Sequence, residues 1–328
     1  MQSRETADGE PRIELRSVRK AFGDVVAIDD LSLSVRDGEI FVLLGQSGCG
    51  KSTVLQLVNR MLDADAGQVL VGGADVQGLD PVALRRTIGY VIQQIGLFPH
   101  RTVAGNVGTV CALSGWDRTA TRARVNDMLE MVGLPASQFA DRYPHQLSGG
   151  QQQRVGVARA LAVSPPILLM DEPFGALDPQ IRRSLQAEFR LWVRALGTTV
   201  VFVTHDVDEA TLLADRMAVL GPHGRLDQVG APVQVLGQPA SPEVADFLGA
   251  DRILKKLTVV AVIQAAARGR HAPPDSAVVD EGSSAYDALL ALITSPSSAV
   301  AVTDARGNAL GVVDWASLAD AARDAPAV

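Results

Sequence analysis

The chain has 328 residues, 20% of them charged and 47% hydrophobic, which is enough for one large α/β domain and a smaller one. Its net charge of -7 excludes the global basic field that holds a nucleic-acid backbone, so we expect no nucleic-acid partner. Two cysteines are too few for a disulfide framework, and residues 1–12 lack the apolar stretch of a signal peptide. The longest apolar stretches, such as residues 257–267, are shorter than the ~20 residues of a membrane-spanning helix.

Short apolar runs separated by turn signals open the sequence. Residues 13–15, 25–27 and 31–35 are predicted to form strands. Residues 40–44 are apolar at every position, which is typical of a strand buried on both faces of a parallel sheet. Glycines follow at once, and a helix is predicted over residues 52–62.

The middle of the chain changes to helical patterning over residues 106–162. Apolar side chains recur there at the spacing of one helix face, at Val125, Met128, Leu129 and Val132. Strand patterning returns at residues 167–170 and 199–204, with a helix predicted between them over residues 179–196. This order predicts a doubly wound α/β sheet into which a helical subdomain is inserted.

A glycine-rich segment joins the strand at residues 40–44 to the following helix. It reads Gly45-Gln46-Ser47-Gly48-Cys49-Gly50-Lys51-Ser52 and fits the phosphate-loop pattern G-x-x-x-x-G-K-[ST]. Glycines let successive backbone N–H groups point at phosphate oxygens, Lys51 neutralises their charge, and Ser52 offers a hydroxyl to Mg²⁺. The candidate nucleotide-binding residues are Gly45, Ser47, Gly48, Cys49, Gly50, Lys51, Ser52 and Thr53.

Cys49 allows two interpretations at this place. A thiolate is stabilised at a helix N-terminus and would react with thiol reagents, whereas a cysteine can also be present only because it is small enough to fit.

Two acids end the buried strand predicted at residues 167–170. Ligands of open parallel sheets bind beyond the carboxyl ends of the strands. Asp171 can therefore hold Mg²⁺, directly or through water, and Glu172 can orient and deprotonate an attacking water. An Asp-Glu-Pro sequence alone is also compatible with a simple helix start, but the phosphate loop favours nucleotide hydrolysis.

Six further elements resemble those of ABC ATPases. The segment Leu147-Ser148-Gly149-Gly150-Gln151 is similar to the family's signature sequence. Asp171-Glu172-Pro173 and the following Ala176-Leu177-Asp178 resemble its Walker B motif and D-loop. Thr204-His205-Asp206 resembles the segment of its switch histidine. Gln93 is similar to the Q-loop glutamine, and Phe22 to the aromatic residue that stacks on adenine.

The resemblance implies a fold and a site. The fold is a P-loop NTPase (RecA-like) core with an antiparallel β subdomain and an inserted helical subdomain. The cofactors are ATP and Mg²⁺; Ser52, Gln93 and Asp171 are the candidate metal ligands, and Glu172, His205 and Gln93 the candidate catalytic residues. The signature residues Ser148, Gly149, Gly150 and Gln151, with Asp178 of the D-loop, would complete the ATP sites of a head-to-tail pair formed with a second copy of the chain.

Other segments resemble one branch of the family, the importers of osmoprotectants and quaternary amines such as glycine betaine, choline and carnitine. These segments are residues 80–100, 143–146, 151–160 and 249–252. Gly105 departs from the pattern, because relatives usually have an acid before Asn106.

The resemblance implies a separate membrane permease, an extracytoplasmic substrate-binding protein, and a peripheral position on the cytoplasmic face of the membrane. An importer of another small solute, such as an amino acid, and a non-transport ABC ATPase are the alternatives.

The composition changes after Gly249, which predicts three parts: the ATPase domain at 12–249 with its helical subdomain near 95–162, a linker at 250–257, and a C-terminal region at 258–328. The last region resembles a single CBS motif, a small α+β unit. Asp314 stands where adenosine-binding motifs have Thr or Ser, which argues against adenylate binding. Ionic-strength sensing, dimerisation and a structural remnant are the open roles.

Overall fold

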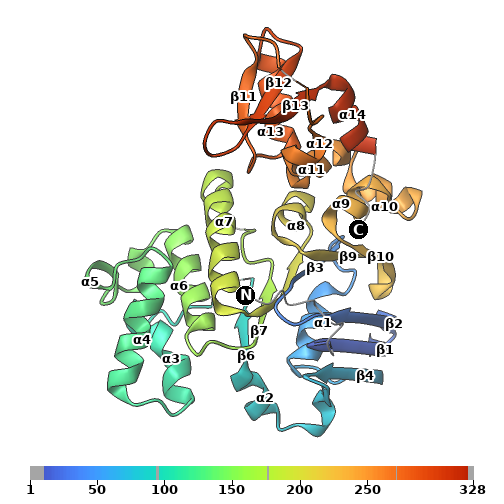
Figure 1. Ribbon diagram of the computed structural model, residues 1–328. Coiled ribbons are helices and arrows are strands. Elements are labelled where there is room, and N and C mark those ends of the chain that lie inside the picture. Colours follow the sequence, from blue (N-terminus) through green and yellow to red (C-terminus); the bar gives the residue numbers. More distant parts are fainter. Residues whose placement is uncertain (1–10, 94–95, 176, 271, 324–328) are drawn as a thin grey trace. The chain divides into compact units, whose positions relative to one another are not determined.

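The computed structural model describes residues 11–93, 96–175, 177–270 and 272–323 (Figure 1). Contacts between residues divide the chain into two compact units. The N-terminal unit comprises residues 1–206 and 218–226, and the C-terminal unit comprises residues 207–217 and 227–328.

An antiparallel sheet of four strands begins the N-terminal unit, in the order β2-β1-β4-β5. Its strands are β1 (Ile13–Phe22), β2 (Val25–Val35), β4 (Ala66–Val71) and β5 (Ala74–Asp75). The runs predicted as two strands at 25–27 and 31–35 form the single strand β2. Asp30 adopts a left-handed conformation, with φ of 56°, between them, and the pairing of β1 with β2 shifts register nearby. This bulge lets one strand continue where the apolar pattern is interrupted.

The central sheet has six strands in the order β10-β9-β3-β8-β7-β6. They are β3 (Ile40–Gly45), β6 (Ile88–Val91), β7 (Ile167–Asp171), β8 (Thr199–Thr204), β9 (Arg216–Leu220) and β10 (Leu226–Gly230). Parallel pairing joins β3 to β8, β8 to β7, and β7 to β6. Every residue of β3 and β8 is buried, as their uninterrupted apolar runs predict. The carboxyl ends of these parallel strands therefore lie along one edge of the sheet.

Two helices follow β3 and β7 at this edge, and a third precedes β6. The helices of this part are α1 (Lys51–Val58), α2 (Pro81–Thr87) and α7 (Pro179–Leu196), with short 3₁₀ turns at η1 (Val76–Gly78) and η3 (Pro222–Gly224). The prediction for α7 is confirmed at both ends, where Asp178 caps it and Gly197 closes it with φ of 62°. Helix α1 ends before the predicted Leu62, because Arg60 adopts a left-handed conformation with φ of 48°.

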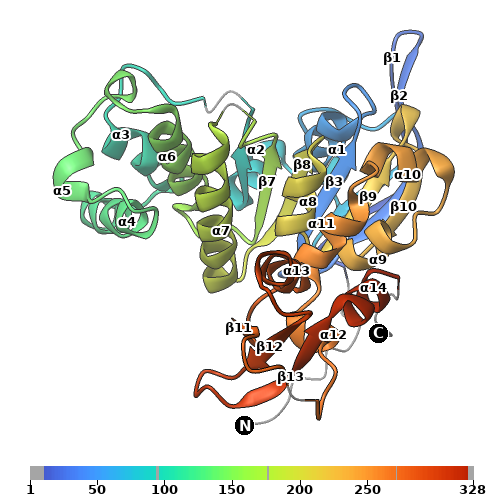
Figure 2. The same cartoon turned by 90° about the horizontal axis from the view of Figure 1, so that it is seen from above.

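The inserted helical part contains α3 (Val103–Leu113), α4 (Arg118–Met131), α5 (Ala136–Phe139), the 3₁₀ turn η2 (Pro144–Gln146) and α6 (Gly149–Leu161). The apolar positions predicted for one helix face, Val125, Met128, Leu129 and Val132, are all buried. Figures 1 and 2 show these helices grouped together, with α7 between them and strands β7 and β8. The mixed α/β core with an antiparallel sheet and a helical insertion agrees with the fold class predicted.

The C-terminal unit has its own apolar core, formed in part by Leu257, Ala288, Val302 and Val313. Its strands β11 (Ala277–Asp280), β12 (Ala299–Thr303) and β13 (Ala309–Asp314) form one mixed sheet in that order. Its helices are α8 (Val207–Leu213), α9 (Pro232–Gly237), α10 (Pro242–Leu248), α11 (Arg252–Val259), α12 (Val262–Ala265), α13 (Ala285–Thr294) and α14 (Trp315–Arg323).

Helix α11 occupies most of the stretch predicted as a linker at 250–257. Lys256 is fully buried in it and donates to the carbonyl oxygen of Ala322 at 2.9 Å. The charged appearance of the segment hides this burial, because a lysine is buried only when its ammonium group finds a partner. No helix among the described residues is long and apolar enough to cross a bilayer.

Candidate functional site

The phosphate loop lies between β3 and α1, as predicted. The ammonium group of Lys51 is buried in it and donates to the carbonyl oxygens of Gly45 and Gln46, both at 2.8 Å. Gly50 caps α1 with φ of 107°. A Cβ atom at Gly50 would lie 2.6 Å from the carbonyl oxygen of Ala27, which explains why only glycine fits there. The loop is thus packed tightly against β2.

Cys49, inside the same loop, exposes 6% of its surface. Its backbone N–H donates to the Gln46 carbonyl at 3.3 Å, and its sulfur lies 3.9 Å from Nζ of Lys51. This burial agrees with the interpretation that Cys49 is present because it is small enough to fit the loop, since a reactive thiolate would need exposure to solvent.

Asp171 ends β7 opposite this loop, and its carboxylate accepts a hydrogen bond from the hydroxyl of Ser52 at 2.9 Å. Burial raises the pKa of Asp171 above its ordinary value, the hydrogen bond from Ser52 opposes this rise, and the charge of Glu172 adds to it. The negative charge of Asp171 also contributes, after burial, to the rise of the pKa of Tyr90 to about 12. A carboxylate whose charged form is disfavoured in this way gains from a nearby cation.

The oxygen donors of Ser52 and Asp171 suit Mg²⁺, which usually takes one or two carboxylates and completes its shell with water and substrate phosphates. No group of three or more His, Cys, Asp or Glu residues in the described chain could hold a metal by itself. The Ser52–Asp171 pair therefore fits a cation that it would share with phosphate oxygens and water.

Glu172 is held by groups from two other segments. Oε2 accepts a hydrogen bond from Nε2 of Gln93 at 3.2 Å, and Oε1 lies 3.0 Å from Nδ1 of His205. Because a carboxylate is an acceptor, this pairing places a proton on Nδ1 of His205. The backbone of Glu172 has φ of 43°, and its N–H donates to the Val203 carbonyl of β8 at 3.0 Å. A non-glycine residue in the left-handed region is strained and persists only where its surroundings impose it.

The structure thus brings together six of the predicted site residues: Lys51, Ser52, Gln93, Asp171, Glu172 and His205. Asp178 caps α7 by accepting a hydrogen bond from the N–H of Gln180 at 3.0 Å. Phe22 exposes 48% of its surface at the end of β1, where the Lys20 ammonium lies 5.6 Å from its ring centroid. Ala176 of the predicted D-loop lies outside the described residues.

The signature segment does not meet the phosphate loop of its own chain among the described contacts. The Ser148 hydroxyl accepts a hydrogen bond from the Gln151 N–H at 3.3 Å, and the Gln151 side chain accepts one from the Ser148 N–H at 3.0 Å. This capping box begins α6. Figures 1 and 2 show α6 among the helices of the insertion, away from α1.

Sequence reasoning missed the contacts of Arg182. Its guanidinium group donates to Oδ2 of Asp206 at 3.3 Å and to the carbonyls of Gly175 at 3.4 Å and Leu177 at 3.2 Å. The available signal was its place four residues after the helix cap Asp178, because side chains of a helix lean towards its N-terminus.

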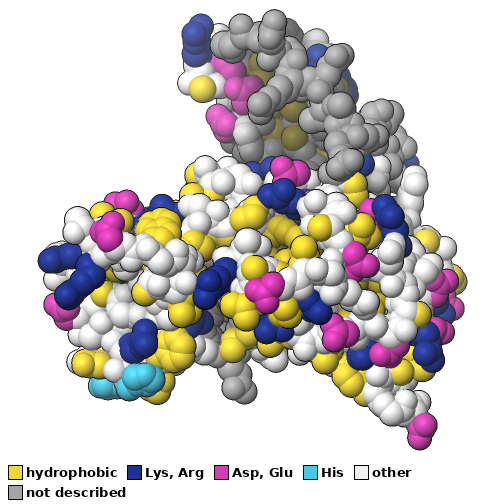
Figure 3. Space-filling view, turned by 90° about the horizontal axis from the view of Figure 1, so that it is seen from below, with side chains coloured by type: hydrophobic (Ala, Val, Ile, Leu, Met, Phe, Trp, Pro, Cys, Tyr) yellow, Lys and Arg dark blue, Asp and Glu magenta, His cyan; other side chains and the backbone are white. Residues whose placement is uncertain are grey.

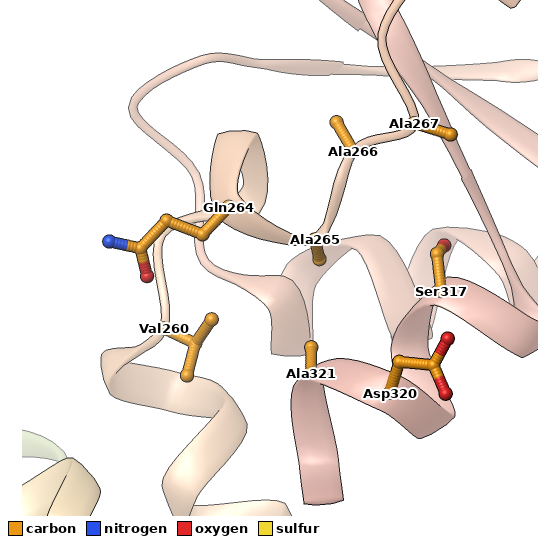
Figure 4. Close-up of a pocket in the computed structure, with 8 residues that line it drawn as sticks. All are labelled: Val260, Gln264, Ala265, Ala266, Ala267, Ser317, Asp320 and Ala321. Carbon is orange, nitrogen blue, oxygen red and sulfur yellow. The ribbon is translucent and has the colours of Figure 1, made fainter. Parts of the chain in front are cut away.

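A cavity of about 260 Å³ lies in the C-terminal unit, between α14 and the segment around α12 (Figure 4). Its polar side chains are Gln264, Ser317 and Asp320. The Ser317 hydroxyl is already used, since it donates to the Asp314 carbonyl at 3.0 Å and accepts from the Asp314 N–H at 2.9 Å. Hydrogen bonds from Ser317, with Arg270 nearby, hold the pKa of Asp314 below its usual range. Position 314 thus presents a negative charge and not a phosphate-binding hydroxyl.

Acidic and basic side chains are interspersed on the face of the molecule that Figure 3 shows. Neither sign forms a continuous stripe there, in agreement with the net charge of -7.

Comparison with known proteins identifies the family. The family model described as "ABC transporter" matches residues 28–175. The osmoprotectant import ATP-binding protein OsmV of Salmonella typhimurium is 48% identical over 243 residues, which are 74% of this chain and 63% of the relative. The glycine betaine uptake system ATP-binding protein YehX of Escherichia coli is 42% identical over 307 residues, 93% of this chain and 98% of the relative. The chain belongs to the ABC transporter family of ATP-binding proteins.

A solved structure gives the same result. The ATP-binding cassette MJ0796, in a dimeric post-hydrolysis state bound to ADP and Pi, matches with a TM-score of 0.60 and 33% identity. The match covers 67% of this chain and 98% of that one. Among the curated relatives, the chain spans 63% of OsmV and 64% of the glycine betaine/carnitine/choline transport ATP-binding protein OpuCA of Bacillus subtilis.

The close approach at Gly50 gives a first prediction. We expect Gly50→Ala to lower the affinity for ATP by about tenfold or more, because its Cβ and the Ala27 carbonyl cannot remain 2.6 Å apart and the loop must shift. Gly115→Ala is the matched control, since Gly115 also has a left-handed backbone, with φ of 80°, but open space around it. Titration with a fluorescent ATP analogue measures both. Equal affinities in the two variants would contradict the role of this contact.

Proposed function

We propose that the chain is the ATP-hydrolysing subunit of an ABC importer. The observation that carries the proposal is the position of the Glu172 carboxylate, held between Gln93 and His205 beside the Ser52–Asp171 pair. An acceptor fixed at the carboxyl edge of a parallel sheet, next to a phosphate loop, is placed to take the proton of an attacking water.

Each residue then has a separate task. Loop amides between Gly45 and Thr53, with the Lys51 ammonium, bind the phosphate chain, while exposed Phe22 offers a face for the base. Ser52 and Asp171, with the Gln93 amide, hold Mg²⁺, which when bound neutralises charge on the phosphate oxygens. Glu172 takes a proton as the water oxygen bonds to the γ-phosphorus and ADP leaves. His205, fixed through Nδ1, turns its other ring nitrogen to the γ-phosphate, and a hydrogen bond there requires a proton on this second nitrogen as well, because the Nδ1 proton is donated to Glu172.

We propose further that two copies pair head to tail, so that Ser148, Gly149, Gly150 and Gln151 of one copy complete the site of the other. Support comes from the distance of α6 from the phosphate loop of its own chain. The N-terminus of this helix of 13 residues offers backbone N–H groups and a positive dipole end to an anion. Asp178, at the adjacent start of α7, would lie at the same junction.

The partner at the membrane is a permease, in this proposal, and the chain works peripherally on the cytoplasmic face. A cavity of about 320 Å³ is lined by residues of α2, β6, α3 and α6, among them the exposed apolar Val82 and Leu113 and the arginines Arg85, Arg86 and Arg159. A permease helix with an apolar face and an acidic side chain fits such a groove. The solute is an osmoprotectant or quaternary amine, delivered by an extracytoplasmic binding protein; support comes from the printed functions of OsmV, OpuCA and YehX.

The C-terminal unit is, in the same proposal, a partial CBS-like regulatory region that does not take an adenylate ligand. Support comes from its order of elements from β11 to α14, a strand, a helix, two strands and a helix, which form a small α+β unit. The charged Asp314 and the occupied Ser317 hydroxyl are what argue against a nucleotide phosphate there.

Hydrolysis is tested by Glu172→Gln. We expect ATP binding to persist, because the phosphate contacts remain, and turnover to fall by about 100-fold or more, because the water loses its base. Size-exclusion chromatography should then show an ATP-dependent dimer. The exposed Glu281→Gln is the matched control and should hydrolyse ATP like the wild type. Near wild-type turnover of Glu172→Gln would remove the assigned role.

The transported solute is tested in the source cell. Deletion of the gene should abolish high-affinity uptake of labelled glycine betaine or choline in high-osmolarity medium, and the wild-type gene should restore it while Glu172→Gln should not. Spermidine uptake is the comparison, because spermidine/putrescine import ATP-binding proteins named PotA are 44–45% identical to this chain. Loss of spermidine uptake with normal betaine and choline uptake would assign the chain to another importer.

The C-terminal unit is tested with Lys51→Ala, which removes the phosphate-neutralising charge from the loop. We expect this variant to lose ATP binding and to show no saturable AMP binding in equilibrium dialysis, because the cavity of the C-terminal unit lacks a free hydroxyl for a phosphate. AMP binding that survives Lys51→Ala and disappears in Asp320→Ala would place a nucleotide in that cavity.

A further inference from the structure

The start of α7 contacts three functional segments of the N-terminal unit. Arg182, in the first turns of the helix, donates to the carbonyl oxygens of Gly175, just before the D-loop, and of Leu177 within it. The same guanidinium group pairs with Asp206, the residue after the switch histidine His205, at 3.3 Å. One residue before Arg182, Ile181 packs against the signature glycine Gly150, where a Cβ atom would come within 2.9 Å of it.

These contacts suit a planar guanidinium group. Its several N–H donors have fixed directions, so one side chain can bind two carbonyls and a carboxylate at once, whereas a lysine offers a single flexible ammonium group. The side chains of Arg182 and Asp206 expose 24% and 32% of their surface, so their attraction is screened less than that of a fully exposed pair. The backbone N–H of Asp206 also donates to the Thr204 hydroxyl at 3.0 Å, which fixes its loop at the end of β8.

The geometry points to Arg182 as a positioning residue. We propose that its guanidinium group, called the fork below, ties the D-loop to the switch loop, residues 204–206. This tie sets the place of His205 beside Glu172. The argument rests on the proposed ATPase function. His205 itself meets Glu172 through a single contact of 3.0 Å, and its side chain is 56% exposed, so the ring depends on its backbone for its position. Asp206, covalently next to it, ties that backbone to α7, as Thr204 on the other side ties it to β3.

Loss of the Arg182 contacts should affect the turnover of ATP more than the affinity for ATP. The contacts of Arg182 described above join the D-loop and the switch loop, whereas ATP binding relies on Lys51 and the amides of the phosphate loop. A displacement of about 1 Å in a catalytic group can reduce the rate by about 100-fold. Loss of the fork should therefore lower kcat and leave KM for ATP nearly unchanged.

In the proposed dimer the effect crosses between the two sites. Gly150 contacts Ile181, and Leu177 of the D-loop contacts Arg182, in the same turn of α7 that holds the switch loop. A change at one site that moves the start of α7 would therefore reach the segment offered to the other site.

The test uses the full chain and measures ATPase kinetics of Arg182→Ala, Asp206→Ala and the double variant. We expect each single variant to lower kcat by about tenfold to about 100-fold with KM within about threefold of the wild type. The double variant should lose no more than the worse single variant, because the two residues act as one unit. Arg182→Lys should stay impaired, since an ammonium group cannot replace the fork. Arg183→Ala, at the neighbouring exposed arginine, is the matched control and should behave like the wild type.

Different results separate the two proposals. A wild-type kcat in Arg182→Ala, a higher KM at constant kcat, or fully additive losses in the double variant would overturn the positioning role and leave the ATPase function standing. If Arg182→Ala fails to bind ATP because it misfolds, Asp206→Asn, which keeps the shape of the side chain, decides by the same criteria. A wild-type protein without ATPase activity would overturn both.

Discussion

The hydrogen bond from the Glu172 N–H to the Val203 carbonyl ties the end of β7 to β8, and the site depends on it. It holds Glu172 in a backbone conformation that non-glycine residues rarely adopt, and this turns the carboxylate towards Gln93 and His205. The neighbouring Asp171 pairs with Val203 in register and stays in line with the strand. Two adjacent acids therefore diverge, one towards the phosphate loop and one towards the switch loop. A register slip of one residue between β7 and β8 would reverse both directions.

The parallel core explains why this divergence can be maintained. Strands β3, β7 and β8 are buried almost throughout, so their register is fixed by close packing on both faces. Their carboxyl ends then deliver Gly45, Asp171 and Thr204 to one edge with little freedom. Loops at this edge can carry strain, such as that of Glu172 or the tight contact at Gly50, because the sheet beneath them does not yield.

Sequence patterns predicted the elements with strong local signals. Strand β8 and helix α7 have the predicted bounds, since an uninterrupted apolar run and a capped amphipathic helix leave few alternatives. The end of α1 was missed, because the left-handed conformation of Arg60 has no glycine to indicate it. Helix α11 was missed as well, since its buried Lys256 looks like a linker residue until the carbonyl of Ala322 is placed beside it. Linear motifs name the residues of a site, but a contact such as that of Arg182 with Asp206 joins two segments whose approach only the fold decides.

The switch loop also marks the place where the two units meet along the chain. Asp206 is the last residue of the N-terminal unit before Val207, and α8 of the C-terminal unit begins there. Within the C-terminal unit, Lys255 of α11 lies 3.3 Å from Asp208 of α8 and 3.3 Å from Asp251. Both acids are well exposed, so these ion pairs are each worth at most about 1 kcal/mol and weaken as salt screens them. Within the C-terminal unit, α8 is therefore held to α11 by a contact whose strength depends on ionic strength.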